Sequence, residues 1–137
     1  MASQNMGAGN IARDDYTYST APISIPAGQT VSQSIQIEAD SDFEILKRMI
    51  FAGLDDYIAV PLTIQITDTG SGRDLLNTPA MVDNVCGTAK LPYILQQTKI
   101  FSARSVIAIT LANVGANQLD NVQVSFGGRK IFGARQY

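Results

Sequence analysis

The feature that most limits what this chain can fold into is a period-two alternation of apolar and polar residues. It is clearest from Ile58 to Asp68, where Val60, Leu62, Ile64 and Ile66 alternate with Pro61, Thr63, Gln65 and Thr67. Successive side chains of a β-strand point to opposite faces, so this segment predicts a strand with one buried face. Because proline cannot donate to a sheet ladder, Pro61 places that end of the strand at a sheet edge or a bulge.

Similar short β-forming runs recur along the rest of the chain. Strands are predicted over 23–25, 31–38, 106–111 and 122–126, and turn signals at 26–28 and 69–72 separate some of them. Strands at intervals of roughly ten residues, without alternating helical patterns, are typical of an antiparallel sandwich or barrel. We therefore predict an all-β protein: a single antiparallel, jelly-roll-like β-sandwich domain over residues 15–137, preceded by a flexible N-terminal arm over residues 1–14.

Residues 38–49, EADSDFEILKRM, form an acidic segment that contains Glu38, Asp40, Asp42 and Glu44. An EF-hand calcium loop would need glycine where this chain has Ile45, which argues against that site. Aspartate side chains bond nearby backbone N–H groups, so residues 40–42 are best interpreted as a turn between strands. Whether Asp40, Asp42 and Glu44 bind a cation stays open at this point.

Residues 43–52 are compatible with two structures. Ser41 and Glu44 match the S-x-x-E capping box, which would start a short helix here. The strands predicted on both sides favour a strand instead, although Lys47 interrupts its apolar face. Further along, residues 73–92 lack periodicity and predict a long irregular loop, of the kind that often forms contact surfaces.

The chain contains no histidine and a single cysteine, Cys86. This excludes Ser-His-Asp and Cys-His nucleophile systems, histidine or thiolate metal sites, and an internal disulfide. We therefore expect no catalytic, cofactor-binding or metal-binding residues and no enzymatic activity. Two alternatives stay open: a small enzyme using carboxylates such as Asp42 and Asp55, and a carbohydrate-binding module using exposed tyrosines. The candidates for the latter are Tyr16, Tyr18, Tyr57 and Tyr93.

Two glycine-containing segments superficially suggest ligand sites. GSGRD, at 70–74, lacks the spacing of a phosphate-binding loop and the helix that should follow it. FGGRKIFGAR, at 126–135, carries basic residues without a helix or interleaved aromatic residues. We expect no dedicated nucleic-acid binding.

Charged residues make up 16% of the chain, which is low for a soluble domain. Residues 1–88 hold four basic and eleven acidic side chains (−7), whereas residues 89–137 hold six basic and one acidic (+5), for a net charge of −2. Either the fold brings the two halves together, or the surface is bipolar and suits copies that meet head to side. The N-terminus shows no signal peptide, and no apolar run approaches the length of a membrane span. We therefore expect a soluble protein made in the cytoplasm.

Several separated segments resemble one protein family. They are Ile25-Pro-Ala-Gly28, Ala39-Asp-Ser-Asp-Phe-Glu44, Gly72-Arg73 with Leu76-Asn77-Thr-Pro79, Ser105-Val-Ile107 with Asn113, and Phe126-Gly-Gly-Arg-Lys-Ile-Phe132. In order and spacing they are similar to small head- or neck-associated structural proteins of tailed-bacteriophage virions. The resemblance implies β-sandwich subunits in symmetric homo-oligomers, assembled into the virion after synthesis in the host cytoplasm. Its motifs are turn and strand-edge patterns, so no catalytic residue carries over.

On this basis we expect a capsid-associated subunit, of the decoration or minor head type, that stabilises the particle through protein contacts. A head–tail junction or collar component is the alternative. The expected partners are further copies of the chain and other virion proteins, such as major capsid or neck proteins, without membrane contact. The predicted contact residues are Met6, Ile11, Arg13, Asp15, Arg73, Asp74, Arg129, Lys130 and Arg135.

Overall fold

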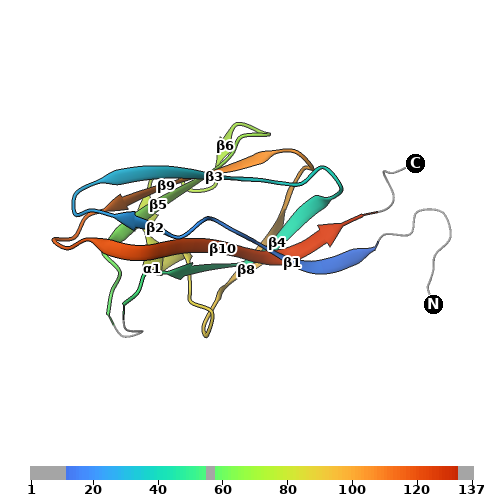
Figure 1. Cartoon of the computed structure of the whole chain (residues 1–137). Coiled ribbons are helices and arrows are strands. Elements are labelled where there is room, and N and C mark those ends of the chain that lie inside the picture. Colours follow the sequence, from blue (N-terminus) through green and yellow to red (C-terminus); the bar gives the residue numbers. More distant parts are fainter. Residues whose placement is uncertain (1–11, 55–57, 133–137) are drawn as a thin grey trace.

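The computed structural model describes residues 12–54 and 58–132, which form two antiparallel sheets packed face to face (Figure 1). Its elements are β1 (Arg13–Ser19), β2 (Ile23–Ile25), β3 (Thr30–Gln36), β4 (Asp42–Phe51), β5 (Leu62–Asp68), β6 (Arg73–Asp74), β7 (Ala80–Met81), α1 (Val82–Val85), β8 (Tyr93–Phe101), β9 (Val106–Asn113) and β10 (Leu119–Ile131).

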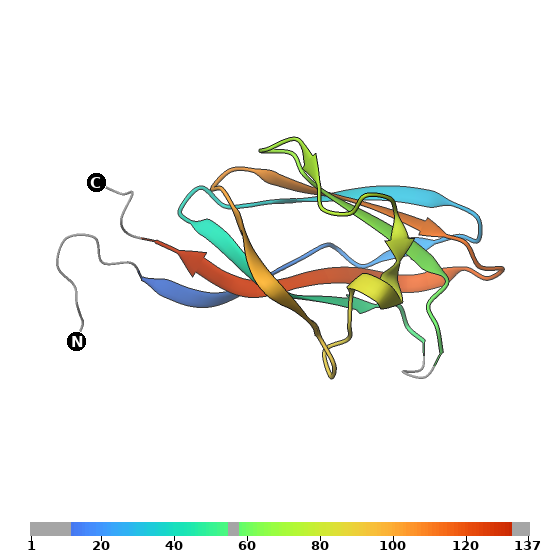
Figure 2. The same ribbon diagram turned by 180° about the vertical axis from the view of Figure 1, so that it is seen from behind.

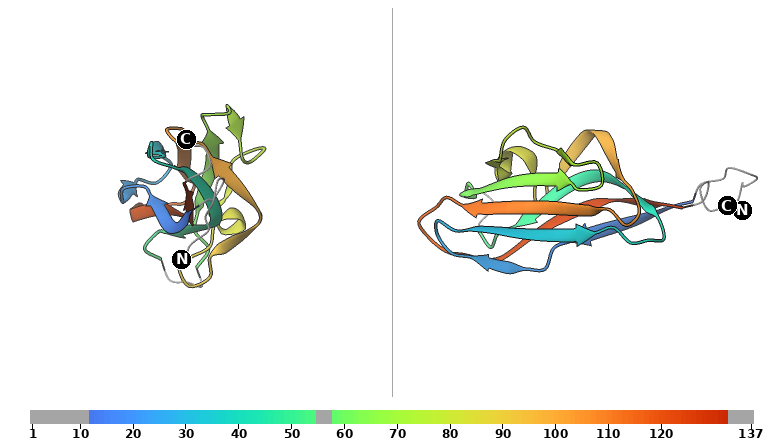
Figure 3. Two further views of the ribbon diagram at one scale, coloured as in Figure 1. Left: turned by 90° about the vertical axis from the view of Figure 1, so that its right-hand side faces the viewer. Right: turned by 90° about the horizontal axis from the view of Figure 1, so that it is seen from above.

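The strand order is that of a jelly roll. One sheet has the order β1-β10-β4-β8, with β2 also paired to β10, and the other has the order β3-β9-β5-β6, with β7 also paired to β5. If β1 with β2, and β6 with β7, are each taken as one interrupted strand, every connection except β5 to β6 crosses between the sheets. Two four-stranded sheets connected in this way form a double Greek key, so the predicted jelly-roll-like sandwich is confirmed (Figure 3).

The core lies between the sheets and consists of the apolar residues that the alternation placed on one face. In β5 the side chains of Leu62, Ile64 and Ile66 are fully buried, whereas the residues between them are partly exposed. The same applies to β9, and across the core β4 and β10 contribute Phe43 and Phe126, both 0% exposed. Each fully buried side chain of this size contributes about 1.5–3 kcal/mol of transfer free energy, so this shared interior is the main source of stability.

Residues 42–51 form a strand, β4, and not the capped helix that was the alternative. The reason is tertiary, since β4 pairs with β10 on one side and with β8 on the other. β8 (Tyr93–Phe101) is a single strand with an interruption in its pairing to β4. The register between β4 and β8 shifts at this point. Ile45 of β4 pairs with Lys99 of β8, and Lys47 of β4 pairs with Ile94 of β8. Residues 95–98 therefore form a bulge in β8.

The segment predicted as an irregular loop, 73–92, contains β6, β7 and the helical turn α1 (Figure 2). It contributes the buried side chains of Val82 and Cys86 to the core. The N–H of Ile50 donates to the carbonyl of Gly87 at 2.8 Å, and the N–H of Gly87 donates to the carbonyl of Arg48 at 3.1 Å, so the segment is bonded to β4. Among residues 12–54 and 58–132, no helix has the length and apolar character needed to cross a membrane.

The two ends of the described chain lie side by side, because β1 and β10 pair from Arg13 with Ile131 to Ser19 with Ser125 (Figure 1). β1 therefore begins at Arg13, inside the segment 1–14 that the sequence predicts as an arm; residues 1–11 lie outside the described residues. β10 runs through Gly127 and Gly128. A Cβ atom on Gly128 would lie 2.0 Å from the carbonyl oxygen of Glu44, so the close approach of β4 requires glycine there.

Candidate functional site

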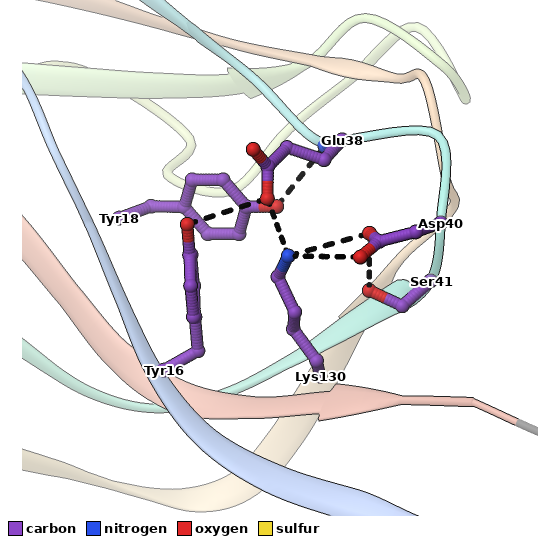
Figure 4. Close-up of polar contacts among 6 residues, drawn as sticks. All are labelled: Tyr16, Tyr18, Glu38, Asp40, Ser41 and Lys130. Atoms are coloured by element: carbon purple, nitrogen blue, oxygen red, sulfur yellow. Dashed lines mark hydrogen bonds and ion pairs between the residues drawn. The ribbon is translucent and has the colours of Figure 1, made fainter.

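The acidic segment surrounds the ammonium group of Lys130 (Figure 4). Lys130 extends from β10 and is 6% exposed. Its Nζ atom forms an ion pair with Glu38 Oε1 and lies 3.3 Å from both carboxylate oxygens of Asp40. Ser41 Oγ in turn donates to Asp40 Oδ1 at 3.2 Å. A buried ammonium is costly unless it is paired, and here two carboxylates from the connection between β3 and β4 provide the pairing.

Two tyrosines of β1 complete this corner cluster, which we define as Tyr16, Tyr18, Glu38, Asp40, Ser41 and Lys130 (Figure 4). Lys130 Nζ lies 4.1 Å from the centroid of the Tyr16 ring, in range for a cation–π interaction. The Tyr16 hydroxyl donates to Glu38 Oε1 at 3.3 Å, and the Tyr18 hydroxyl accepts from the backbone N–H of Glu38 at 3.0 Å. The cluster therefore joins β1, β10 and the β3–β4 corner.

The protonation of Lys130 follows from this environment. Burial by itself would lower the pKa of Lys130, but its hydrogen bonds to Glu38 and Asp40 outweigh burial and raise the pKa above the ordinary lysine value. Lys130 is thus held as a cation near neutral pH and is unsuited to act as a base or nucleophile. Chemically, the corner cluster is an ionic clamp between distant segments of the chain.

The other two carboxylates of the acidic segment have their own partners. Asp42 Oδ1 accepts from the backbone N–H of Ala103 at 2.9 Å. Glu44 pairs with Arg129 Nη2 at 3.0 Å and accepts from Thr98 Oγ1 at 2.8 Å. Within the part of the chain that the structure describes, no three His, Cys, Asp or Glu side chains are grouped so that they could hold a metal ion. Glu38 and Asp40 therefore stabilise the β3–β4 corner, and Asp42 and Glu44 stabilise the contacts of β4 with neighbouring segments.

A further ion pair links the two sheets at β8, an edge strand of its sheet. Lys99 of β8 lies with its Nζ atom 3.3 Å from Asp68 Oδ2 of β5. Asp68 is 5% exposed and also accepts from the backbone N–H of Gly70 at 3.0 Å and from Ser71 Oγ at 3.1 Å. Together with the pairs formed by Arg129 and Lys130, this contact brings basic residues of the second half against acidic residues of the first half. The charge asymmetry of the sequence is thus partly offset inside one domain, which favours the first of its two interpretations.

The structure places the predicted contact residues in three environments. Arg13 and Asp15 are exposed on β1, and Arg73 and Asp74 are exposed on β6, where Asp74 accepts from Thr67 Oγ1 at 2.6 Å. Arg129 is partly exposed and already paired with Glu44. The prediction for Lys130 needs correction, because its ammonium group is buried within the chain and is not available to a partner. Met6, Ile11 and Arg135 lie outside the described residues.

The sequence interpretation missed an apolar surface at β8. Leu91, Ile94 and Ile100 are 80%, 62% and 52% exposed, and we call them the β8 apolar surface. Ile94 and Ile100 pair with Lys47 and Glu44 of β4, whose own side chains are partly exposed. These apolar residues were visible in the sequence, but only the strand order shows that β8 is an edge strand, with no strand beyond it among residues 12–54 and 58–132.

The three candidate tyrosines that the structure describes, Tyr16, Tyr18 and Tyr93, do not form the exposed row that a carbohydrate-binding module needs. Tyr18 is 7% exposed, and Tyr16 belongs to the corner cluster. Tyr93 lies at the opposite edge of the same sheet, where the Arg48 guanidinium carbon is 4.9 Å from its ring centroid. Tyr57 lies outside the described residues, as does Asp55, one of the two carboxylates considered for catalysis.

No protein-family model matches this chain, and no curated protein sequence matches it. Among solved structures, it is similar to the VP2 subviral particle of infectious bursal disease virus, with a TM-score of 0.42, 14% identity, and coverage of 95% of this chain and 35% of that chain. It is also similar to dimeric latent PorU from Porphyromonas gingivalis, with a TM-score of 0.39, 8% identity, and coverage of 93% of this chain and 14% of that chain. The chain thus spans about a third of the length of the first structure. Likenesses this distant assign neither a family nor a function.

Proposed function

We propose that this protein is a structural subunit of a tailed-bacteriophage virion. It acts as a capsid-associated protein of the decoration or minor head type, stabilising the particle through protein contacts without catalytic turnover. The observation that carries the proposal is the division of the jelly roll into two kinds of surface. Lys99, Arg129 and Lys130 form ion pairs within the chain, whereas the outer face of β3-β9-β5 is uncharged and β8 carries exposed apolar side chains.

The outer face of the sheet β3-β9-β5 is the clearest uncharged area. β3 and β9 contain no charged residue, and the single charged residue of β5, Asp68, is buried. The outward positions of these strands hold mainly serine, threonine, glutamine and alanine: Thr30, Ser32, Ser34, Gln36, Thr63, Gln65, Thr67, Val106, Ala108, Thr110 and Ala112. The centres of protein–protein interfaces are depleted in charged residues, so this face suits contact with other proteins.

The β8 apolar surface supports the same proposal. Its three large apolar side chains are 52–80% exposed on and beside one edge strand, and exposed apolar side chains of this kind can be covered by a partner protein. Small contact areas of this kind become effective in a symmetric particle, because many copies bind at once. The same features fit a head–tail junction subunit, for which the number of copies in each particle is the distinguishing measurement. The sequence resemblance to virion structural proteins is the separate support for a phage setting.

The test uses particles of the phage whose genome carries the gene. We expect mass spectrometry to find the protein in purified virions, and we expect the purified protein to bind particles assembled without it. The double variant Ile94→Ser/Ile100→Ser should bind these particles more weakly, by about tenfold or more, since it removes buried apolar area at the contact. Val114→Ser is the matched control, because Val114 is also exposed (60%) but lies outside the β8 apolar surface. A protein that is abundant in producing cells but absent from virions would contradict the proposal.

A further inference from the structure

The sandwich has four edges, and three of them carry features that oppose the addition of another strand. The edge at β1 carries Arg13, Asp14 and Asp15. The edge at β8 is interrupted by the bulge at 95–98 and carries Lys99, which points inward to Asp68. The edge at β6 and β7 consists of strands of two residues each. Charges, bulges, inward lysines and short strands are the common devices that protect sheet edges.

The fourth edge, β3, has none of these devices. Its seven residues, TVSQSIQ, pair with β9 from Thr30 with Ala112 to Gln36 with Val106 without a register shift. The strand contains no charged residue and no proline. Among the described residues, no strand pairs with its other side, and its outward side chains are exposed. A regular, uncharged and unpaired strand of this length is a template for strand addition.

The backbone of β3 presents a defined set of free groups. On the β9 side, the N–H of Ile37 donates to Ser105 and its carbonyl accepts from Arg104, while the carbonyl of Gln29 accepts from Asn113. Because backbone groups alternate in direction along a strand, the odd-numbered residues of β3 bond toward β9. The N–H and C=O groups of the even-numbered residues, which are Thr30, Ser32, Ser34 and Gln36, therefore point to the free edge.

We propose that β3 pairs antiparallel with β3 of a second copy, about a two-fold axis at Gln33. The full overlap of the two strands then places Ser32 opposite Ser34 of the second copy and Thr30 opposite Gln36 of the second copy. On the inward face, Val31 meets Ile35 of the second copy, a favourable pair of β-branched residues. The pairing joins the β3-β9-β5 sheets of two molecules into one continuous sheet with an uncharged outer face.

Gln33 lies at the centre of the proposed pairing and is compatible with a second copy as the added strand. Its Nε2 atom donates to the carbonyl of Ala21 at 3.1 Å, but its Oε1 atom has no hydrogen-bond partner among the described residues, although it is shielded from solvent. At the two-fold axis each Gln33 faces Gln33 of the other copy across a non-hydrogen-bonded pair, where side chains lie closest. This pair brings two uncharged amide side chains together and adds no charge to the contact.

Electrostatics also favours self-pairing. Two β3 strands bring no charges together, whereas pairing of β3 with β1 would bury Arg13, Asp14 and Asp15 beside an uncharged strand. This inference deepens the proposed function, which supplies its biological setting, but its test needs only the purified chain. A dimer that does not enter virions would contradict the proposed function alone, and a virion protein that is monomeric in solution would contradict the β3 pairing alone.

The test measures the mass of the purified full chain in solution, by light scattering and sedimentation, with three charge variants on exposed positions. We expect the unsubstituted protein to form a dimer. Ser32→Lys/Ser34→Lys places lysine opposite lysine twice and should weaken the dimer by about tenfold or more. Ser32→Lys/Ser34→Glu places lysine opposite glutamate twice and should restore the dimer, which a shifted register would not allow. Circular dichroism confirms that each variant is folded.

A matched control places the same charges on another edge. Thr17→Lys/Ser19→Lys alters exposed residues of β1 and should leave the dimer unchanged. A monomer at high concentration would overturn the inference. So would a dimer that resists Ser32→Lys/Ser34→Lys, or one that is lost equally with lysine and with glutamate at position 34.

Discussion

The Nζ atom of Lys130 lies 3.3 Å from both carboxylate oxygens of Asp40, although the two residues are 90 positions apart in the sequence. Lys130 belongs to the last strand of the fold and Asp40 to the corner between β3 and β4, so the contact joins an early part of the chain to its final strand. Glu38 and Tyr16 bind the same ammonium group. The acidic segment thus stabilises the closure of the sandwich.

Replacing Lys130 by methionine should destabilise the fold. The variant leaves Glu38 and Asp40 without their counter-ion, and because both carboxylates retain access to water, we expect the free energy of unfolding to fall by about 1–3 kcal/mol. Urea denaturation measures the change. Arg73→Met, at an exposed position of β6, is the control and should change stability by less than about 0.5 kcal/mol. Equal stabilities of the two variants would show that the ionic clamp contributes nothing.

The two neighbouring glycines of β10 should differ sharply when changed to alanine. A Cβ atom on Gly128 would lie 2.0 Å from the backbone carbonyl oxygen of Glu44, whereas one on Gly127 would meet the flexible side chain of Lys47, with Cε at 2.6 Å. We expect Gly128→Ala to lower the free energy of unfolding by about 2–3 kcal/mol or more, and Gly127→Ala by less than about 1 kcal/mol. Thermal unfolding of both variants measures the difference. A Gly128→Ala variant as stable as Gly127→Ala would mean that β4 and β10 are further apart than described.

Cys86 should make stability depend on pH in the alkaline range. Burial raises the pKa of the Cys86 thiol from about 9 to about 11. Between these values the folded state holds the proton and the unfolded state releases it, so unfolding becomes easier as pH rises. The loss is about 1.4 kcal/mol for each pH unit, or about 2–3 kcal/mol by pH 11.

Comparison with Cys86→Ala isolates this effect, because Tyr18 and Lys130, whose pKa values are also raised, are present in both proteins. The stability difference between the two proteins should be constant below about pH 8 and shrink between about pH 9 and pH 11. Denaturation curves at several pH values measure it. Parallel curves across the whole range would rule out a buried thiol at position 86.

Removing residues 1–11 should leave the fold intact. The paired part of β1 begins at Arg13, so the deletion keeps the complete β1–β10 ladder and the tyrosines of the corner cluster. We expect the free energy of unfolding to change by less than about 0.5 kcal/mol. Deletion of residues 1–18, which also removes Tyr16 and Tyr18, is the comparison and should be strongly destabilised. Binding of the shorter deletion to particles then measures whether residues 1–11 contribute to assembly; unchanged binding would count against Met6 and Ile11 as contact residues.

The alternation of apolar and polar residues predicted strands correctly where one face of the strand is buried. The alternation in β5 and the apolar positions of β3, β9 and β10 identified strands and their inward faces, because side-chain direction in a strand depends only on the parity of the residue. It was less reliable from 73 to 101, where the structure has short strands, a helical turn and a bulged strand. The residues there are held by contacts with β4 and β5, such as the bonds from Gly87 to β4, which no local signal encodes.

The sequence by itself determined that this protein is an all-β sandwich without histidine chemistry, since composition and period-two alternation are properties of the chain alone. Only the tertiary structure decided which strands are edges and which charges are buried. It shows that Lys130, which we expected to be a contact residue, is a cation buried within the chain. It also shows that β3 is the edge strand that carries none of the features that oppose strand addition. Strand pairing joins residues far apart in the sequence, and the choice among possible partners depends on how the sheets close around a common core.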